Sequence, residues 1–340
     1  MQNLRPHPQP TRWSSRLPRI GPTLRPYIVL VLLAAVLWGL DGGHGRFISM
    51  ATLASVLQQF ATLGPFALAL GLSMIVREFD LSIAGMLSFA GCVAVLLGQQ
   101  HPLIGIAVAL ALGLAVGAVQ GLLIVRLQLA SVGVTLGGLL TLSGLSYVLT
   151  GNAVLGFDHA QATLAVNAPL AGVFTLRSLL ALAAFGLAAV VMAFTRIGRD
   201  VGAAGSHPRG ALIAGVPVPG LIVAVFALSG LLTALAGSLL SYSLAAASPI
   251  ALADVLIPAT AAAILGGVSL AGGRGTPLGI AGGVLVLCLL RSGLTAIGAK
   301  PYVQDVLTGA VLLAVAVADA PDLRMRLRRA MKRWGSDRGQ

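Results

Sequence analysis

Long stretches of this chain carry no charged side chain, and this feature most limits what the chain can fold into. No Asp, Glu, Lys or Arg lies between Asp80 and Arg126, between Arg126 and Asp158, or within residues 210–253. Only 9% of the 340 residues are charged, whereas soluble proteins carry about 25%. Because a helix needs about 20 predominantly apolar residues to cross a membrane, the sequence predicts an all-α polytopic membrane protein.

Apolar runs that are separated by Gly, Pro and polar residues predict ten transmembrane helices. The predicted spans are residues 26–40, 54–76, 81–98, 102–125, 131–150, 178–195, 218–243, 253–270, 276–297 and 303–318. The first span is short and the eighth is rich in Ala, Gly and Pro, so we expect either one to be tilted, broken or partly re-entrant. An even number of spans places both termini on the same side of the membrane.

Lysine and arginine are distributed unevenly over the two sides of this predicted bundle. If the N-terminus is cytoplasmic, 18 of the 22 basic residues face the cytoplasm. The other four are Arg46, Arg177, Arg291 and Lys300. Cytoplasmic loops of membrane proteins carry an excess of Lys and Arg, so the sequence predicts that the N- and C-termini are both cytoplasmic. The net charge of +12 is then explained by the orientation of the chain in the membrane, so we expect no nucleic acid as a partner.

These patterns divide the chain into three parts. Residues 1–25 are predicted to form a basic cytoplasmic arm, and residues 320–340 a basic cytoplasmic tail. Residues 26–319 form the transmembrane domain, which contains one long polar loop at residues 196–217.

The chain lacks the residue patterns of most enzymes. Its two lysines, Lys300 and Lys332, stand in no G-x-x-x-x-G-K-[ST] motif, so the chain cannot bind ATP through a P-loop of its own. The five histidines have no metal-ligand spacing, and Cys92 and Cys288 lie in apolar runs as small buried hydrophobic residues. We therefore expect no catalytic residue, no metal and no cofactor.

Acidic residues that could couple transport to an ion gradient are also scarce. Glu78 is the single glutamate. The aspartates near the membrane stand at predicted span ends, where they cap helices or meet interfacial water rather than relay ions. They are Asp80, Asp254, Asp305 and Asp319. The energy for uphill transport is then expected from a separate ATPase that contacts the cytoplasmic face.

The polar loop near the middle of the chain has the length and pattern of a helical insert. Within it, "SHPRGALIAGV" predicts a short helix that Ser206 caps, Pro208 begins and Gly215 ends. The apolar residues of this helix, which are suited to a groove in a partner, are Ala211, Leu212 and Ile213. We interpret the loop as a rigid cytoplasmic protrusion for the ATPase.

This loop resembles that of the membrane permease subunits of carbohydrate ABC importers, the ribose, xylose, arabinose and galactose class. The family pattern is approximately G-R-x-x-x-A-x-G-x-N-x-x-A-A-x-x-x-G-I. The resemblance implies that the loop is the coupling helix, which docks on the ATP-binding subunit. The residues implied in this coupling are Gly198, Arg199, Gly205, Ser206, His207, Pro208, Arg209, Ala211 and Gly215.

The resemblance covers residues 54–319 and is strongest in "AAAILGGVSLAGGRG", which is close to the family's A-V-V-L-G-G-T-S-L-x-G-G-R-G. "FDLSIAG" similarly resembles G-I-D-L-S-V-G. Three departures from the family concern Arg77-Glu78 in place of Gly-Gly, Ser131-Val132 near a missing Pro-Phe, and Arg291 in place of Asn. They leave open which solute is carried and whether the chain pairs as a homodimer or a heterodimer.

Glycine is denser in "LGGVSLAGGRG" than close helix packing requires. We hypothesise a distorted inner gate here, formed by Gly266, Gly267, Ser269, Gly272, Gly273 and Arg274. Asp80 and Ser82 would stand in the equivalent turn of the first half. Arg291 has two interpretations, because its side chain either extends to the outer membrane interface or lines the sugar pathway.

Taken together, the resemblance implies a multi-pass permease subunit in the bacterial cytoplasmic membrane that forms the pathway for a monosaccharide or a related small polar solute. The implied partners are a second permease copy, a cytoplasmic ATP-binding subunit that hydrolyses ATP, and a periplasmic or extracellular sugar-binding protein. Two alternatives remain, namely a permease of a branched-chain amino-acid ABC importer and a secondary transporter that works alone. Ion-relay carboxylates within the membrane would favour the second alternative.

Overall fold

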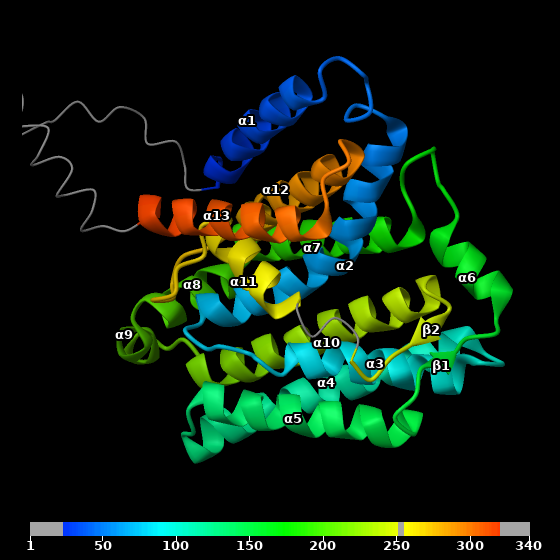
Figure 1. The fold of residues 1–340 in the computed structure, drawn as a ribbon. Helices are drawn as coiled ribbons and strands as arrows, with labels where there is room; N and C mark the ends of the chain where they lie inside the picture. The colour runs from blue at the N-terminus through cyan, green and yellow to red at the C-terminus, as the bar shows by residue number, and fades with distance from the viewer. Residues whose placement is uncertain (1–22, 251–254, 320–340) are drawn as a thin grey trace, which may run out of the picture.

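The computed structural model describes residues 23–250 and 255–319, which form a bundle of roughly aligned helices (Figure 1). The predicted arm up to residue 22, the predicted tail and Asp254 lie outside the described residues. Within the described residues a helix lies in each predicted span. These helices are α1 (Arg25–Leu40), α2 (Met50–Ile75), α3 (Ile83–Gly98), α4 (Pro102–Leu127), α5 (Ser131–Thr150), α7 (Leu176–Phe194), α10 (Val218–Ser243), α11 (Leu256–Leu265), α12 (Pro277–Ala296) and α13 (Pro301–Asp319).

The helix bounds agree with the sequence prediction except at the eighth span. The bounds of α5 and α10 are those predicted, whereas α11 ends at Leu265 and not at residue 270. The chain turns directly afterwards, because Gly267 has a φ of +87°, in the left-handed region that glycine adopts readily. The eighth predicted span is therefore a short helix followed by a glycine-rich loop.

Helix α10 lies at the centre of the bundle and packs against α4, α3 and α2. Its close approach to α4 depends on glycine. A Cβ atom on Gly117 would collide with the carbonyl of Phe226, and one on Gly230 with the carbonyl of Gly113. Small residues allow such backbone contact, which stabilises helix pairs in lipid. Helix α12 packs on α2, α11 and α1 and forms the other part of the bundle.

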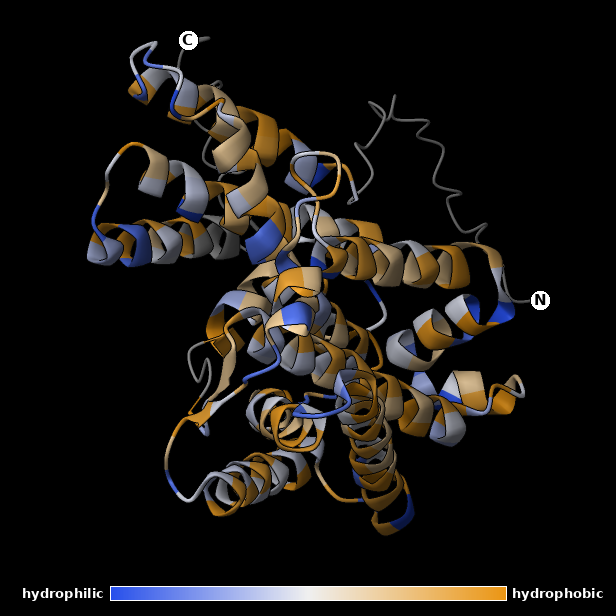
Figure 2. Cartoon of the chain, turned by 90° about the vertical axis from the view of Figure 1, so that its right-hand side faces the viewer, coloured by the Kyte–Doolittle hydropathy of each residue, from blue (hydrophilic) through white to orange (hydrophobic). Residues whose placement is uncertain are grey.

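Hydrophobic residues dominate the helices at the periphery as well as in the core (Figure 2). Within the described residues, six helices are long and apolar enough to cross a membrane: α2, α4, α5, α7, α10 and α12. Large apolar side chains such as Leu103, Val148 and Leu187 are exposed on α4, α5 and α7. An exposed apolar surface of this extent requires lipid around it, so the chain is an all-α, multi-pass membrane protein.

One end of the bundle is covered by a segment for which the sequence predicted no regular structure. It contains α6 (Ala160–Asn167) and a two-residue strand β1 (Leu155–Gly156), which pairs antiparallel with β2 (Ala246–Ala247). The Phe157 ring stacks on Tyr242, with ring centroids 4.2 Å apart. The Tyr242 hydroxyl lies 3.0 Å from the Ala94 carbonyl and 2.8 Å from the Pro102 carbonyl. Phe157 thus fastens the segment to α10, and the Tyr242 hydroxyl joins α10 to α3 and α4.

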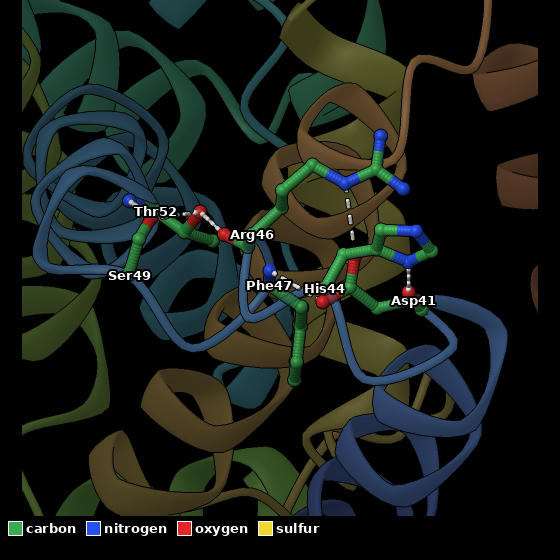
Figure 3. A network of polar contacts seen from close by, with 6 residues as sticks. All are labelled: Asp41, His44, Arg46, Phe47, Ser49 and Thr52. Atoms are coloured by element: carbon green, nitrogen blue, oxygen red, sulfur yellow. Dashed lines mark hydrogen bonds and ion pairs between the residues drawn. The ribbon is translucent and has the colours of Figure 1, made fainter.

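The loop between α1 and α2 is held together by the buried carboxylate of Asp41 (Figure 3). Asp41 accepts hydrogen bonds from Arg46 Nε at 3.2 Å and from the Phe47 amide at 3.3 Å. Burial alone would raise the pKa of Asp41, but the hydrogen bonds from Phe47 and Arg46 hold it below its usual value. Ser49 then caps the start of α2, because its hydroxyl accepts from the Thr52 amide at 3.1 Å.

Candidate functional site

The predicted coupling loop, residues 196–217, is called here the coupling segment. It folds into two short helices, α8 (Arg196–Ser206) and α9 (Pro208–Ile213), which lie at the left end of the bundle in Figure 1. Helix α9 ends as the sequence predicts, because Gly215 adopts a φ of +84°. The amide of the following residue then donates to the Ala211 carbonyl at 3.0 Å, which closes the helix end.

The predicted cap of this helix was wrong by one residue. His207, not Ser206, precedes α9, and its ring Nδ1 accepts a hydrogen bond from the Gly210 amide at 2.9 Å. Pro208 follows at the first helical position, as predicted. Ser206 instead ends α8, where its hydroxyl donates back to the Gly202 carbonyl at 2.8 Å. The physical reason is that a second helix, α8, already occupies the residues before His207.

The exposed side of α9 is apolar, and the coupling segment also exposes arginines. Ile213 is 90% exposed and Leu212 is 50% exposed. Arg199 and Arg209 are exposed as well. Ala211 was predicted to face a partner, but it is buried in this chain's own core. The exposed residues of the coupling segment thus include Leu212 and Ile213, the two arginines, and the predicted coupling residues Ser206 and His207.

Two glycines of α8 are required because other backbone segments touch them. A Cβ atom on Gly198 would collide with the carbonyl of Met192, at the end of α7. A Cβ atom on Gly205 would collide with the carbonyl of Ile75, the last residue of α2, and with the amide of Gly273 at 2.6 Å. The coupling segment is thus packed tightly on the helix ends beneath it.

The predicted gate lies in a glycine-rich loop, residues 266–275, between α11 and α12. Left-handed or otherwise positive φ values occur at Gly267, Gly272, Gly273 and Gly275. The loop closes on itself through a hydrogen bond from the Ser269 amide to the Arg274 carbonyl at 3.0 Å. Gly266 serves a different purpose, because a Cβ there would meet the carbonyl of Gly279 on α12 at 2.5 Å. The Arg274 side chain is exposed.

The structure brings the coupling segment and the glycine-rich loop into direct contact. The Gly273 amide donates to the Ile75 carbonyl at 2.8 Å. A Cβ on Gly273 would meet the Ser206 backbone amide at 2.6 Å. We call this meeting of the ends of α2 and α8 with the loop the glycine junction. The residues predicted for coupling and the residues predicted for the gate therefore contact each other.

Arg77, which stands out in the sequence only as a departure from the family, also joins the glycine junction. Its Nε donates to the Ala271 carbonyl at 2.6 Å, and its Nη2 donates to the Ser206 carbonyl at 3.2 Å. The neighbouring Glu78 has a raised pKa because of burial, and a hydrogen bond with Ser131 opposes this shift. Since the partners of Arg77 are backbone carbonyls, no sequence pattern could have indicated them.

Asp80 and Ser82 follow Arg77 in the chain, at the start of α3. Asp80 was predicted either to stand at a helix end or to meet interfacial water. It is 2% exposed and its Oδ1 accepts from the Ser82 amide at 3.0 Å, so it fits the first of these two roles. Its carboxylate accepts from the Ser82 hydroxyl at 2.6 Å and from the Ser229 hydroxyl at 2.7 Å. The Ser82 hydroxyl also lies 2.8 Å from Gln120 Oε1. This cluster links the start of α3 to Gln120 of α4 and Ser229 of α10.

Arg291 is not part of this cluster or of the glycine junction. Its Nη2 lies 3.2 Å from Asp305 Oδ1, and the two side chains are 38% and 71% exposed. The pair joins α12 to α13 near the opposite end of the bundle. Within residues 23–250 and 255–319, no three His, Cys, Asp or Glu side chains come together to hold a metal ion.

Comparison with known proteins identifies the family. Residues 52–316 match the family described as "Branched-chain amino acid transport system / permease component". The chain is 30% identical over 302 residues to the ribose import permease protein of Escherichia coli K12, covering 86% of this chain and 92% of that protein. It is 30% identical to the L-arabinose ABC transporter permease protein of Azospirillum brasilense, covering 84% of each chain.

A third relative, the fructose import permease protein of Rhizobium meliloti, is 31% identical over 315 residues, covering 88% of this chain and 85% of that protein. No solved structure matches this chain significantly. The matches to import permeases of several sugars confirm the resemblance that the glycine-rich motif indicated. The chain belongs to the permease family of branched-chain amino acid transport system components, among relatives that import sugars.

Proposed function

We propose that this chain is the membrane-spanning permease subunit of an ABC importer for a monosaccharide or a related small polar solute. The observation that carries this proposal is the match, over more than four fifths of the chain, to permeases named for ribose, arabinose and fructose. The family description names branched-chain amino acids, but the relatives with about 30% identity are named for sugars. The sugar assignment is therefore favoured over the amino-acid alternative.

We further propose ten transmembrane helices with both termini and the coupling segment in the cytoplasm. Two observations support this arrangement. The start of α1, the end of α13 and the helices α8 and α9 lie towards the same end of the bundle (Figure 1). That arrangement also leaves 18 of the 22 basic residues on the cytoplasmic side, which is the usual bias of membrane proteins.

In this proposal the chain itself catalyses no reaction. A separate ATP-binding subunit docks on the exposed Leu212 and Ile213 of α9 and hydrolyses ATP. A second permease copy, identical or different, completes the pathway in the membrane. A sugar-binding protein delivers the solute at the outer end. The glycine junction supports this division of roles, because it connects the coupling segment, which carries the docking surface, to the end of α2 and to the loop between α11 and α12.

The proposal is tested by reconstituting the permease with its ATP-binding subunit and binding protein in liposomes. Uptake of labelled ribose, arabinose, fructose and leucine is measured with ATP and with a non-hydrolysable analogue. We expect ATP-dependent uptake of a sugar and no uptake of leucine. Uptake of leucine alone would favour the amino-acid alternative. Uptake by the permease alone, abolished when the ion gradient is dissipated, would favour a secondary transporter.

A further inference from the structure

Arg77 occupies a backbone conformation that arginine rarely adopts. Its φ is +70°, in the left-handed region where glycine is favoured because it has no Cβ. Residues held in this region persist where the surrounding contacts fix them, and they cluster at functional sites. The contacts of Arg77 are therefore informative about what it does.

These contacts bridge two segments that are far apart in the sequence. The Nε of Arg77 lies 2.6 Å from the Ala271 carbonyl of the glycine-rich loop, and Nη2 lies 3.2 Å from the Ser206 carbonyl. Ser206 is the last residue of α8, so its carbonyl stands at the negative end of the helix dipole, where a cation is favoured. One planar guanidinium thus binds both segments at once.

The glycine-rich loop provides space for this side chain. A Cβ atom on Gly272 would collide with Cγ of Arg77 and would also lie 3.0 Å from the Gly205 carbonyl. Gly272 has a φ of +79°, which a residue with a side chain would rarely adopt. The loop therefore fits around the stem of Arg77 as well as around the backbone of α8.

We propose that Arg77 is a positioning residue that ties the coupling segment to the glycine-rich loop, so that movement of α8 and α9 is passed to α11 and α12. The inference rests on the proposed function, because it assumes that a partner moves the coupling segment. Without this guanidinium, the junction keeps the backbone bond from the Gly273 amide to the Ile75 carbonyl and a long hydrogen bond of 3.4 Å from the Ser206 hydroxyl to the Gly273 carbonyl.

Three substitutions of Arg77 separate the side chain from the backbone. Arg77→Gly removes the guanidinium and suits a positive φ. Arg77→Asn also tolerates this conformation but does not add the flexibility of glycine. Arg77→Lys keeps the charge but loses the planar fork that reaches two carbonyls. Arg126→Ala is the matched control, because Arg126 is exposed and makes no side-chain hydrogen bond within the described residues.

Each variant is purified as the complete complex with its ATP-binding subunit and reconstituted in liposomes. Solute uptake per ATP hydrolysed, the rate of ATP hydrolysis and the stoichiometry of the subunits are measured. Hydrogen exchange of residues 266–275 and 196–206 reports whether the two segments remain joined. A residue with only a structural role would not change uptake per ATP in a complex that assembles and hydrolyses ATP normally.

We expect Arg77→Gly and Arg77→Asn to assemble and hydrolyse ATP, while uptake per ATP falls about tenfold or more, because both charge-assisted hydrogen bonds of the guanidinium are lost. Arg77→Lys should lose less, and Arg126→Ala should match the wild type. Hydrogen exchange should become faster in both segments of the Gly and Asn variants.

Wild-type uptake per ATP in Arg77→Gly and Arg77→Asn would overturn the inference and leave the proposed function intact. Loss of the ATP-binding subunit from these variants, or failure of all three to insert, would also overturn it, because Arg77 would then serve assembly or folding. If the wild-type complex itself shows no ATP-dependent uptake, the proposed function fails, independently of Arg77.

Discussion

The two ends of the bundle are held together in different ways. At the glycine junction, the backbones of α2, α8 and the glycine-rich loop touch directly, as in the bond from Gly273 to Ile75, and the side chain of Arg77 bonds only to backbone carbonyls. At the opposite end, side chains make the contacts. Asp41 holds its loop, Tyr242 stacks on Phe157, and the buried Arg177 donates to the hydroxyls of Ser243 and Thr62.

The two ends should therefore respond differently to amino-acid substitutions. Backbone atoms cannot move aside for a new side chain, so even one methyl group at the glycine junction should disturb several elements together. Side-chain contacts at the opposite end can be removed one at a time, each with a limited loss of stability. The glycine junction is thus suited to transmit displacement, and the opposite end is suited to remain fixed.

The largest effect is expected from Gly205→Ala. The new Cβ would collide with the Ile75 carbonyl and lie 2.6 Å from the Gly273 amide, so we expect a loss of about 3 kcal/mol, as for severe overpacking. Thermal aggregation in detergent measures it. Gly202→Ala, in the same helix with open space around its Cβ, is the control and should not destabilise the protein. Equal stability of both variants would contradict the rigid junction.

A smaller effect is expected from Tyr242→Phe at the opposite end. The variant keeps the stacking on Phe157 but removes the hydroxyl that lies near the Ala94 and Pro102 carbonyls. Because buried acceptors are left without their donor, we expect a loss of about 1–2 kcal/mol. The same thermal assay measures it. Tyr147→Phe is the control, because Tyr147 is exposed, and it should leave the stability unchanged. An equal loss of stability in this control would contradict the explanation.

The Asp41 loop should respond to acid more gradually. The pKa of Asp41 is held below its usual value by Phe47 and Arg46, against the opposing effect of burial. Its stabilising contribution is therefore present above the pKa of the unfolded chain, about 3.9, and is lost as the pH falls through the lower folded value. Below pH 4, the amides of residues 41–49 should lose protection against hydrogen exchange, measured relative to an unfolded chain at the same pH. Asp41→Asn should exchange fast at every pH; wild-type protection in this variant would contradict the interpretation.

The smallest effect on stability is expected for the Arg291–Asp305 pair. Both side chains are partly exposed, at 38% and 71%, and exposed ion pairs contribute about 0–1 kcal/mol. A double-mutant cycle with Arg291→Ala and Asp305→Ala measures their coupling. Solute uptake by Arg291→Ala separates the two interpretations of Arg291. If Arg291 lines the pathway, the variant should lose transport without losing stability. If its side chain extends to the membrane interface, the variant should transport normally.

The sequence predicted the positions of most helices because a helix that crosses lipid must be predominantly apolar along its length. The bounds of α5 and α10 follow from apolar runs between polar or Pro breakers. Helix α11 was predicted too long because apolar composition continues through Val268, although Gly267 already turns the chain. The cap at His207 was missed because α8 was not predicted as a helix that ends at Ser206.

The glycine junction itself could not be predicted in detail. The glycines of the coupling segment and of the loop were selected as two separate sets, since their contact depends on how α2, α8 and the loop pack in three dimensions. Arg77 was visible as a departure from the family, but its acceptors are the carbonyls of Ala271 and Ser206. Carbonyls are common to all residues and therefore leave no signal in a sequence.

The side of the membrane on which the coupling segment lies can be measured by cysteine labelling. Ile213→Cys places a thiol at a position that is 90% exposed, and the native Cys92 and Cys288 are buried. Val154→Cys provides an exposed thiol near the opposite end. We predict that an impermeant maleimide labels Ile213→Cys only in inverted vesicles, that the ATP-binding subunit protects it, and that Val154→Cys is labelled in intact cells. Labelling of Ile213→Cys in intact cells would contradict a coupling segment that a cytoplasmic ATPase moves.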